Sequence, residues 1–74
     1  MKARKVVREV SKRDWLIERR KKIGMTQQDV ANLAGVTCAA YCHYEKGRRT
    51  PPPRIAERLG GILGLDKTLF YFPN

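Results

Sequence analysis

The sequence predicts an all-α fold, a compact bundle of about five short helices with a basic N-terminal arm. Apolar residues recur at helical spacing through most of the chain. Thr or Asp precedes several of these segments, where a helix would be capped, and Gly follows them, where a helix would end. The 74 residues allow one domain at most, near the lower limit for folding on a hydrophobic core alone. We therefore divide the chain into an arm (1–12), a helical domain (13–71) and a tail (72–74).

The first helix is expected to begin at Arg13 and to end before Gly24. Its inner stripe mixes apolar and basic side chains, namely Trp15, Leu16, Arg19, Arg20 and Ile23. The second helix follows Thr26, whose hydroxyl is expected to cap the first turn while Asp29 completes a capping box. The residues expected on its buried face are Val30, Ala31, Leu33 and Ala34.

Gly35 is expected to end the second helix in a left-handed conformation. Thr37 then caps a third helix, which runs to about Lys46 and turns Tyr41 and Tyr44 inward. Gly47 is expected to end this third helix.

A loop that begins at Arg48 leads to a fourth helix, in which Pro52 or Pro53 suits the first position. Its buried side is marked by Ile55, Leu59, Ile62 and Leu63. Gly60 and Gly61 lie in its interior, where each costs roughly 1 kcal/mol relative to Ala. Asp66 is expected to cap a last short helix. That helix carries Leu69, Phe70 and Tyr71.

Residues 27–46 meet the requirements of a helix-turn-helix, in which one helix lies in the DNA major groove and a second crosses close behind it. The close crossing needs a small residue, which Ala31 supplies, and the turn needs a positive φ, which Gly35 supplies. The apolar residues expected on the two inner faces are Val30, Ala34, Val36, Tyr41 and Tyr44. This pattern predicts a domain that binds double-stranded DNA.

Segments 24–37 (GMTQQDVANLAGVT) and 44–51 (YEKGRRTP) carry a highly specific combination of residues. This combination resembles the Cro/C1-type (XRE-like) helix-turn-helix family. The end of the domain, Leu65-Asp66 followed by Leu69-Phe70, is also similar, so the resemblance covers about residues 15–71. The resemblance implies a lambda-repressor-like DNA-binding domain with its third helix in the major groove. It also implies a short phage-type or bacterial transcriptional regulator.

The same resemblance implies which residues contact DNA. Gln27, which opens the second helix, would grip a phosphate with help from the positive end of the helix dipole. Arg48 and Arg49 would reach the DNA backbone from the loop, while the groove-facing positions are Cys38, Ala39, Cys42 and His43. The full predicted set is Gln27, Gln28, Thr37, Cys38, Ala39, Cys42, His43, Arg48 and Arg49.

The groove-facing positions predict weak base readout. Related domains commonly have Arg, Gln, Asn or Ser where this chain has Cys38 and Ala39. Ala39 can pack against a thymine methyl group and His43 can hydrogen-bond a base edge, but neither side chain makes a bidentate contact. We therefore expect modest discrimination between sequences, with affinity carried mainly by Lys and Arg on phosphates.

Glu45 has two interpretations, a catalytic carboxylate or a structural one. In the family that the chain resembles, this position pairs with an arginine of the first helix, which Arg20 matches. We favour the structural ion pair, because an unpaired buried carboxylate is costly. Arg19 stands where relatives usually have an apolar residue, so the inner face of the first helix is expected to be poor in apolar surface.

Sixteen Lys and Arg against seven Asp and Glu give a net charge of +9, which favours a polyanionic partner over a merely solvated basic surface. A membrane partner is not expected, because the basic segment lacks a matching apolar face and no apolar run approaches ~20 residues. The arm is interpreted as a solvated tail, a strand, or an extension along the phosphates. We favour the extension, because basic arms gain affinity by releasing counterions.

Cys38 and Cys42 are expected to be free thiols, because their spacing in a helix does not suit a disulfide. Together with His43 they are too few to close a zinc site, since the chain has 2 Cys and 1 His. We expect no metal and no cofactor. A redox switch, in which oxidation of Cys38 blocks the groove, is an alternative role for this pair.

These observations predict a Cro- or repressor-like transcriptional regulator rather than an enzyme, because we find no paired carboxylates, no glycine-rich phosphate loop and no nucleophile with a base. The alternative is an antitoxin-type module that binds DNA and also a small protein partner, through the arm or the tail. Any homodimer interface is expected in the C-terminal region, in the fourth or fifth helix and the Leu69–Phe72 segment. The basic start lacks the apolar stretch of a signal peptide, which predicts a cytoplasmic, nucleoid-associated protein.

Overall fold

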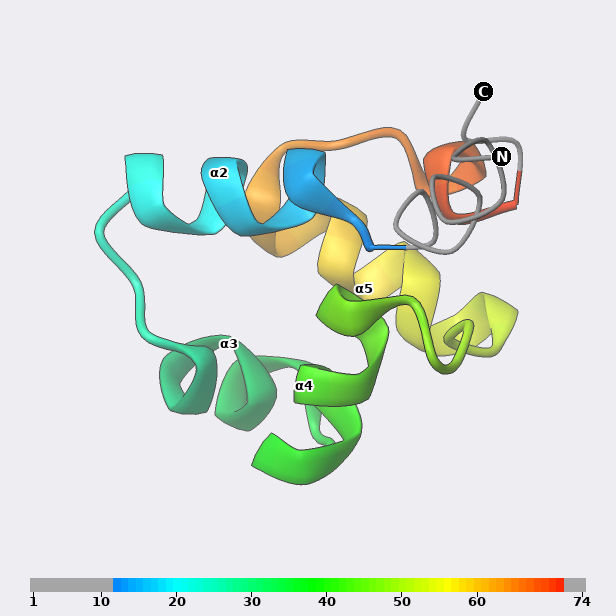
Figure 1. Ribbon diagram of the computed structural model, residues 1–74, viewed down its shortest axis with the longest axis horizontal. Coiled ribbons are helices and arrows are strands. Elements are labelled where there is room, and N and C mark those ends of the chain that lie inside the picture. The colour runs from blue at the N-terminus through cyan, green and yellow to red at the C-terminus, as the bar shows by residue number, and fades with distance from the viewer. Residues whose placement is uncertain (1–11, 72–74) are drawn as a thin grey trace, which may run out of the picture.

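A computed structural model describes residues 12–71, and within this range the chain forms four α-helices and one 3-10 helix (Figure 1). They are α2 (Asp14–Lys22), α3 (Gln27–Ala34), α4 (Cys38–Lys46), α5 (Pro53–Leu63) and η1 (Lys67–Phe70). The predicted all-α class is confirmed, although the last of the expected helices is a 3-10 helix. The predicted arm, apart from Lys12, and the predicted tail lie outside the described residues.

The capping residues act as the sequence predicts. The Thr26 hydroxyl accepts a hydrogen bond from the backbone N–H of Asp29, and the Asp29 carboxylate accepts one from the N–H of Thr26 (both 3.0 Å). The Thr37 hydroxyl accepts from the N–H of Ala40 at the start of α4. Asp66 accepts from the N–H of Thr68 at the start of η1. Each of these helices therefore begins where its side-chain cap stands.

Glycines end both α3 and α4. Gly35, which separates α3 from α4, has a φ of 77°, and Gly47, which ends α4, has a φ of 76°. Residues with a Cβ rarely adopt this left-handed conformation. The C-terminal ends of α3 and α4 are thus set by residues without side chains.

The core lies where α3 and α4 pack on each other and on α5, with α2 across the other side (Figure 1). Val30, Ala31, Ala34 and Tyr41 are fully buried, as predicted. Leu33 was expected in the core, but it is 59% exposed. Adjacent helical residues are separated by roughly 100° around the axis. Because Val30, Ala31 and Ala34 define the buried face, Leu33 falls to one side of it.

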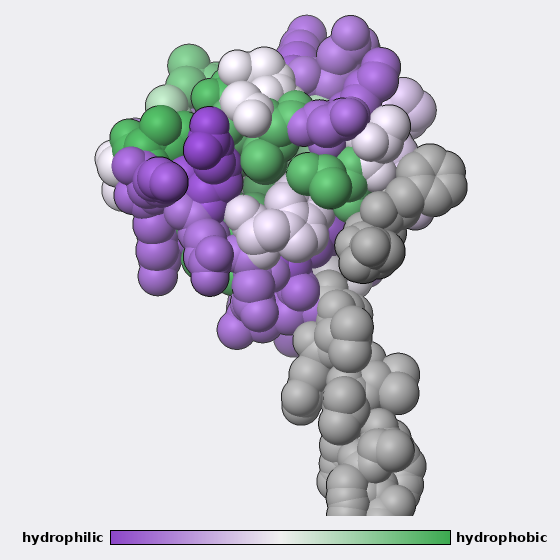
Figure 2. All heavy atoms as spheres, turned by 90° about the horizontal axis from the view of Figure 1, so that it is seen from above, coloured by the Kyte–Doolittle hydropathy of each residue, from purple (hydrophilic) through white to green (hydrophobic). Residues whose placement is uncertain are grey.

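The face that carries α2 mixes charged and apolar side chains (Figure 2). Leu16 and Arg20 are buried, Trp15 is half-buried, and Ile23 is 43% exposed. Arg19 contributes polar contact rather than apolar surface, because its Nε donates to the carbonyl of Leu63 at 2.7 Å. It therefore satisfies a carbonyl at the C-terminus of α5, where a positive charge is favourable.

The C-terminal aromatic residues are less available for association than the sequence suggests. Phe70 is only 3% exposed and packs edge-on against Trp15, with ring centroids 5.2 Å apart. The Tyr71 hydroxyl donates to the carbonyl of Pro51 at 3.0 Å, although the side chain remains partly exposed. Phe72 lies outside the described residues. Phe70 thus belongs to the core and not to an exposed apolar surface.

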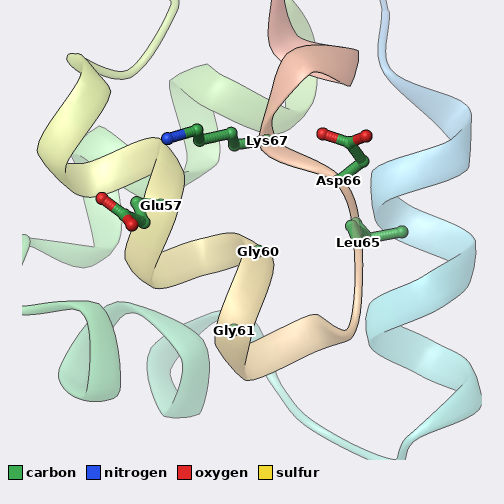
Figure 3. Close-up of a pocket in the computed structure, with 6 residues that line it drawn as sticks. All are labelled: Glu57, Gly60, Gly61, Leu65, Asp66 and Lys67. Carbon is green, nitrogen blue, oxygen red and sulfur yellow. The ribbon is translucent and has the colours of Figure 1, made fainter.

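The glycine pair inside α5 has two different environments. A Cβ built on Gly60 would lie 2.7 Å from the carbonyl oxygen of Leu65, whereas nothing lies within 4 Å of a Cβ on Gly61. The N–H of Leu65 donates to the carbonyl of Gly60, so the chain turns back closely against the helix here. Figure 3 shows both glycines on α5 and the segment from Leu65 to Lys67 that runs alongside. Close backbone approach explains Gly60, and no contact explains Gly61.

We predict opposite effects of alanine at these two sites. Gly61→Ala should raise the free energy of unfolding by about 0.5–1 kcal/mol, because alanine restricts the unfolded chain and fits the helix. Gly60→Ala should lower it by about 1–3 kcal/mol, because the Leu65 carbonyl must move. Urea unfolding followed by circular dichroism measures both. Equal effects at the two positions would contradict this packing.

Candidate nucleic-acid interface

α4 has a buried face and an outward face. Tyr41, Tyr44 and Glu45 are buried and hold the helix against the rest of the domain. The positions on the opposite side are Ala39, His43 and Lys46, spaced four and three residues apart. We call these residues the outward stripe of α4. Ala39 and Lys46 are exposed and His43 is half-buried.

Cys38 and Cys42 lie beside the outward stripe and are not part of it. Both side chains are half-buried, and Cys38 packs against the core. Both thiols are free. Within residues 12–71 no group of at least three His, Cys, Asp or Glu side chains is placed to hold a metal ion. Of the two, Cys42 lies nearer to the outward stripe, because α4 turns Cys38 toward its inner face.

His43 has one ring nitrogen inside the protein. Its Nδ1 is buried and has no hydrogen-bond partner among the described residues. Only Nε2 can therefore reach a ligand on the outward side of α4. This nitrogen can donate one hydrogen bond or accept one, depending on which nitrogen carries the proton.

The N-termini of α3 and α4 carry the other predicted polar residues. Thr37 is exposed, and because its oxygen accepts from Ala40, its hydroxyl proton remains available to donate. Gln28 is exposed, and its amide nitrogen donates to Asn32 one turn later. The partial positive charge at a helix N-terminus favours an anion at both places.

A buried network joins α2, α3 and α4. Arg20 Nε donates to Glu45 Oε2 at 2.6 Å, and Gln27 Nε2 donates to Glu45 Oε1 at 2.8 Å. Arg20 also donates to the carbonyl of Met25, in the loop between α2 and α3. Sequence reasoning anticipated the pairing of Arg20 and Glu45 but assigned Gln27 only to DNA. The network fixes the Gln27 side chain at the start of α3.

The environment of Glu45 favours its charged form. Burial acts to raise the pKa of this carboxyl, but hydrogen bonds from Arg20 and Gln27 outweigh burial and hold the pKa below its ordinary value. Burial raises the pKa of the neighbouring Tyr41 hydroxyl, which stays neutral. The network therefore holds one buried carboxylate against one arginine.

Sequence reasoning missed Arg13, which the structure buries to 8% exposure. Its Nη1 donates to the carbonyls of Tyr44 (2.6 Å) and Arg49 (2.9 Å), and its Nη2 donates to the hydroxyl of Thr50 (3.0 Å). The one signal in the sequence is its position. A basic residue at the start of a helix opposes the helix dipole, which points to a role outside that helix.

The exposed basic residues nearest to α4 follow its C-terminus. Arg48 and Arg49 are both exposed, directly after Gly47. Lys46 precedes this glycine on the outward stripe. A phosphate backbone beside α4 would thus meet cationic side chains that the described contacts leave in solvent.

We predict that the Glu45 network makes stability depend on pH. The folded pKa of Glu45 lies below the unfolded value, so its contribution is complete above pH of about 4.5 and is lost as pH falls through the folded pKa. Glu45→Gln should lower the free energy of unfolding at pH 7 by on the order of 3 kcal/mol, because Arg20 loses its buried partner.

Urea unfolding between pH 3 and 7 measures the difference in the free energy of unfolding between Glu45→Gln and the unsubstituted protein. This difference should become smaller toward low pH. Glu57→Gln, at an exposed position of α5, is the matched control and should run parallel to the unsubstituted protein. A Glu45→Gln deficit that stays constant with pH would contradict the assignment.

Comparisons with known proteins identify a helix-turn-helix family. A helix-turn-helix family model matches residues 16–70. Over 59 residues the chain is 37% identical to an uncharacterized HTH-type transcriptional regulator, YqaF, of Bacillus subtilis strain 168, with 80% of this chain and 78% of the relative covered.

Over 54 residues it is 38% identical to an uncharacterized HTH-type transcriptional regulator of Methanothermobacter thermautotrophicus, with 73% and 78% covered. No solved structure gives a significant match. In the part of the chain that the structure describes, no helix is long and apolar enough to cross a membrane. The chain belongs to the Cro/C1-type (XRE-like) helix-turn-helix family, whose members are DNA-binding regulators of transcription.

Proposed function

We propose that this protein acts as a Cro- or repressor-like regulator that places α4 in the major groove of double-stranded DNA. The observation that carries the proposal is the division of α4 into a pinned inner face and an outward stripe. Tyr41, Tyr44 and Glu45 fix the helix, so Ala39 and Lys46 need no partner inside the protein. A helix held in this way can enter a groove without losing its support.

Phosphate contacts would surround the groove. Arg48 and Arg49 reach one strand from the loop after α4, and Gln28 and Thr37 meet phosphates at the N-termini of α3 and α4. Gln27 donates only one of its amide protons to Glu45, which leaves the second for a phosphate. Sequence-independent affinity would come mainly from these residues.

Base contacts would come from the outward stripe and Cys42. Ala39 offers a methyl group to thymine, and His43 offers Nε2 to a base edge. Neither residue makes the bidentate hydrogen bonds that discriminate strongly between bases. The proposed function is therefore regulation of transcription by DNA binding with modest sequence discrimination. No contact of residues 12–71 favours the antitoxin alternative over this function.

A charge-reversal experiment tests the position of α4. Ala39→Glu should weaken binding to a labelled duplex of random sequence at least about tenfold, because the carboxylate would enter the negative potential of the groove. Gly61→Glu adds the same charge at an exposed helix position on α5 and should change the affinity little. Fluorescence anisotropy measures both. Equal losses from the two variants would rule out α4 as the DNA-facing helix.

We also predict a low specificity ratio. Selection of bound duplexes from a random pool, followed by salt titration of the selected and random sequences, should give a ratio well below ~10⁶. A ratio at or above that level would show that the outward stripe reads bases more strongly than Ala39 and His43 allow.

A further inference from the structure

Arg13 connects the start of α2 to the loop that follows α4. Its backbone N–H donates to the carbonyl of Glu45 at 2.9 Å, and its guanidinium reaches beyond α4 to Arg49 and Thr50. These contacts span 36 and 37 positions of the chain. One buried side chain therefore holds the last turn of α4 and the loop after it in a fixed relation.

The position of Arg13 is costly for the protein. Burial lowers the pKa of its guanidinium, because the charge has lost water. Its hydrogen-bond acceptors within the described residues are carbonyls and a hydroxyl, with no carboxylate to neutralise it. The centroid of the Phe70 ring lies 5.5 Å from the guanidinium carbon, and this cation–π contact offsets part of the desolvation free energy. An apolar side chain would fill this space without a buried charge.

Arginine provides here what an apolar residue or a lysine does not. The planar guanidinium directs donors along fixed directions, so it can hold several acceptors at once. It binds the carbonyl of Arg49 and the side chain of the next residue, Thr50. The peptide that joins them is thereby oriented on both sides. The backbone N–H groups of Arg48 and Arg49 are held as well, by the carbonyl of His43 at 3.0 and 3.4 Å.

The side chains that this loop presents are exposed and basic. The backbone at Arg48 and Arg49 determines the direction in which their side chains leave the protein. The contacts that fix this backbone come from α4 on one side and from Arg13 on the other. A change at Arg13 would therefore alter the direction of charges that it does not itself contribute.

We propose that Arg13 is a positioning residue for DNA binding, which acts by orienting Arg48 and Arg49 toward the phosphates. This inference rests on the proposed function. It assigns a role in DNA binding to a buried residue at the start of α2. In this proposal Arg13 acts without contacting DNA itself. Such a role predicts coupling between Arg13 and the two loop arginines.

A double-mutant cycle tests this coupling. The dissociation constant is measured for a fluorescein-labelled random-sequence duplex of about 20 base pairs, at several salt concentrations. The variants are Arg13→Lys, the pair Arg48→Ala with Arg49→Ala, and all three substitutions together. Each lost phosphate contact lowers the magnitude of the log–log salt slope by about 0.9. We expect Arg13→Lys alone to lower the slope, although it preserves the charge. In the background without the loop arginines, we expect it to change nothing further.

Arg19→Lys is the matched control. Arg19 is also partly buried and also donates to a carbonyl at a helix C-terminus, but that carbonyl belongs to Leu63 of α5. It should leave the salt slope unchanged. Thr50→Val removes only the acceptor of Nη2 at an exposed position, and it should lower the slope in the same direction without unfolding the domain. If Arg13→Lys does not fold, Thr50→Val still tests the inference.

The outcomes separate the inference from the proposed function. If the unsubstituted protein binds no duplex even at low salt, the proposed function fails. If it binds, and loss of Arg48 and Arg49 lowers the slope while Arg13→Lys and Thr50→Val do not, the inference alone fails. The inference also fails if Arg13→Lys weakens binding equally with and without the loop arginines, because that result indicates a purely structural role.

Discussion

The arrangement of α2, α3 and α4 depends on the buried carboxylate of Glu45. Glu45 lies on α4, accepts hydrogen bonds from Arg20 of α2 and Gln27 of α3, and is almost inaccessible to solvent. The helix that we propose to enter DNA is thus fixed in the domain by charge and geometry as well as by apolar packing. Short hydrogen bonds from Arg20 and Gln27 restrict the position of α4 relative to α2 and α3.

Several of the 16 basic side chains make contacts within the domain instead of projecting freely into solvent. Arg20 is paired with Glu45, and Arg13 and Arg19 hold carbonyls at the C-terminal ends of helices. Arg58 does the same at the end of α3, where its Nη1 donates to the carbonyl of Ala34 at 3.2 Å. In a domain of this size, long basic side chains also serve as helix caps. Composition alone therefore identifies the class of partner, but it does not identify the residues that meet it.

Local signals predicted much of the fold. Thr26, Thr37 and Asp66 cap helices where the sequence places caps, and Gly35 ends α3 as expected, because these effects act within a few residues. The burial of Leu33 was predicted wrongly, since the apolar pattern of a short helix does not settle which neighbour of Ala34 faces inward. The apolar pattern along the sequence does not predict which residues of different helices contact one another.

The candidate site shows the same limit. Of the outward stripe, Ala39 and His43 were predicted as groove-facing from their place in the helix-turn-helix, whereas Lys46 was not. Arg13 was missed, and Gln27 was assigned to DNA alone, because their partners lie on other helices far along the chain. Gly60 appeared as an unexplained cost in a helix until the approach of the Leu65 carbonyl gave its reason.

The two faces of α4 have a further consequence. Ala39 and Lys46 are exposed, whereas Tyr41, Tyr44 and Glu45 are the buried residues of this helix. On α4, folding and the proposed base contacts therefore rest largely on different residues. Under the proposed binding mode, exchanges on the solvent side can retarget the protein to new operators at little thermodynamic expense, so closely related chains with the same stability can diverge in the genes they control.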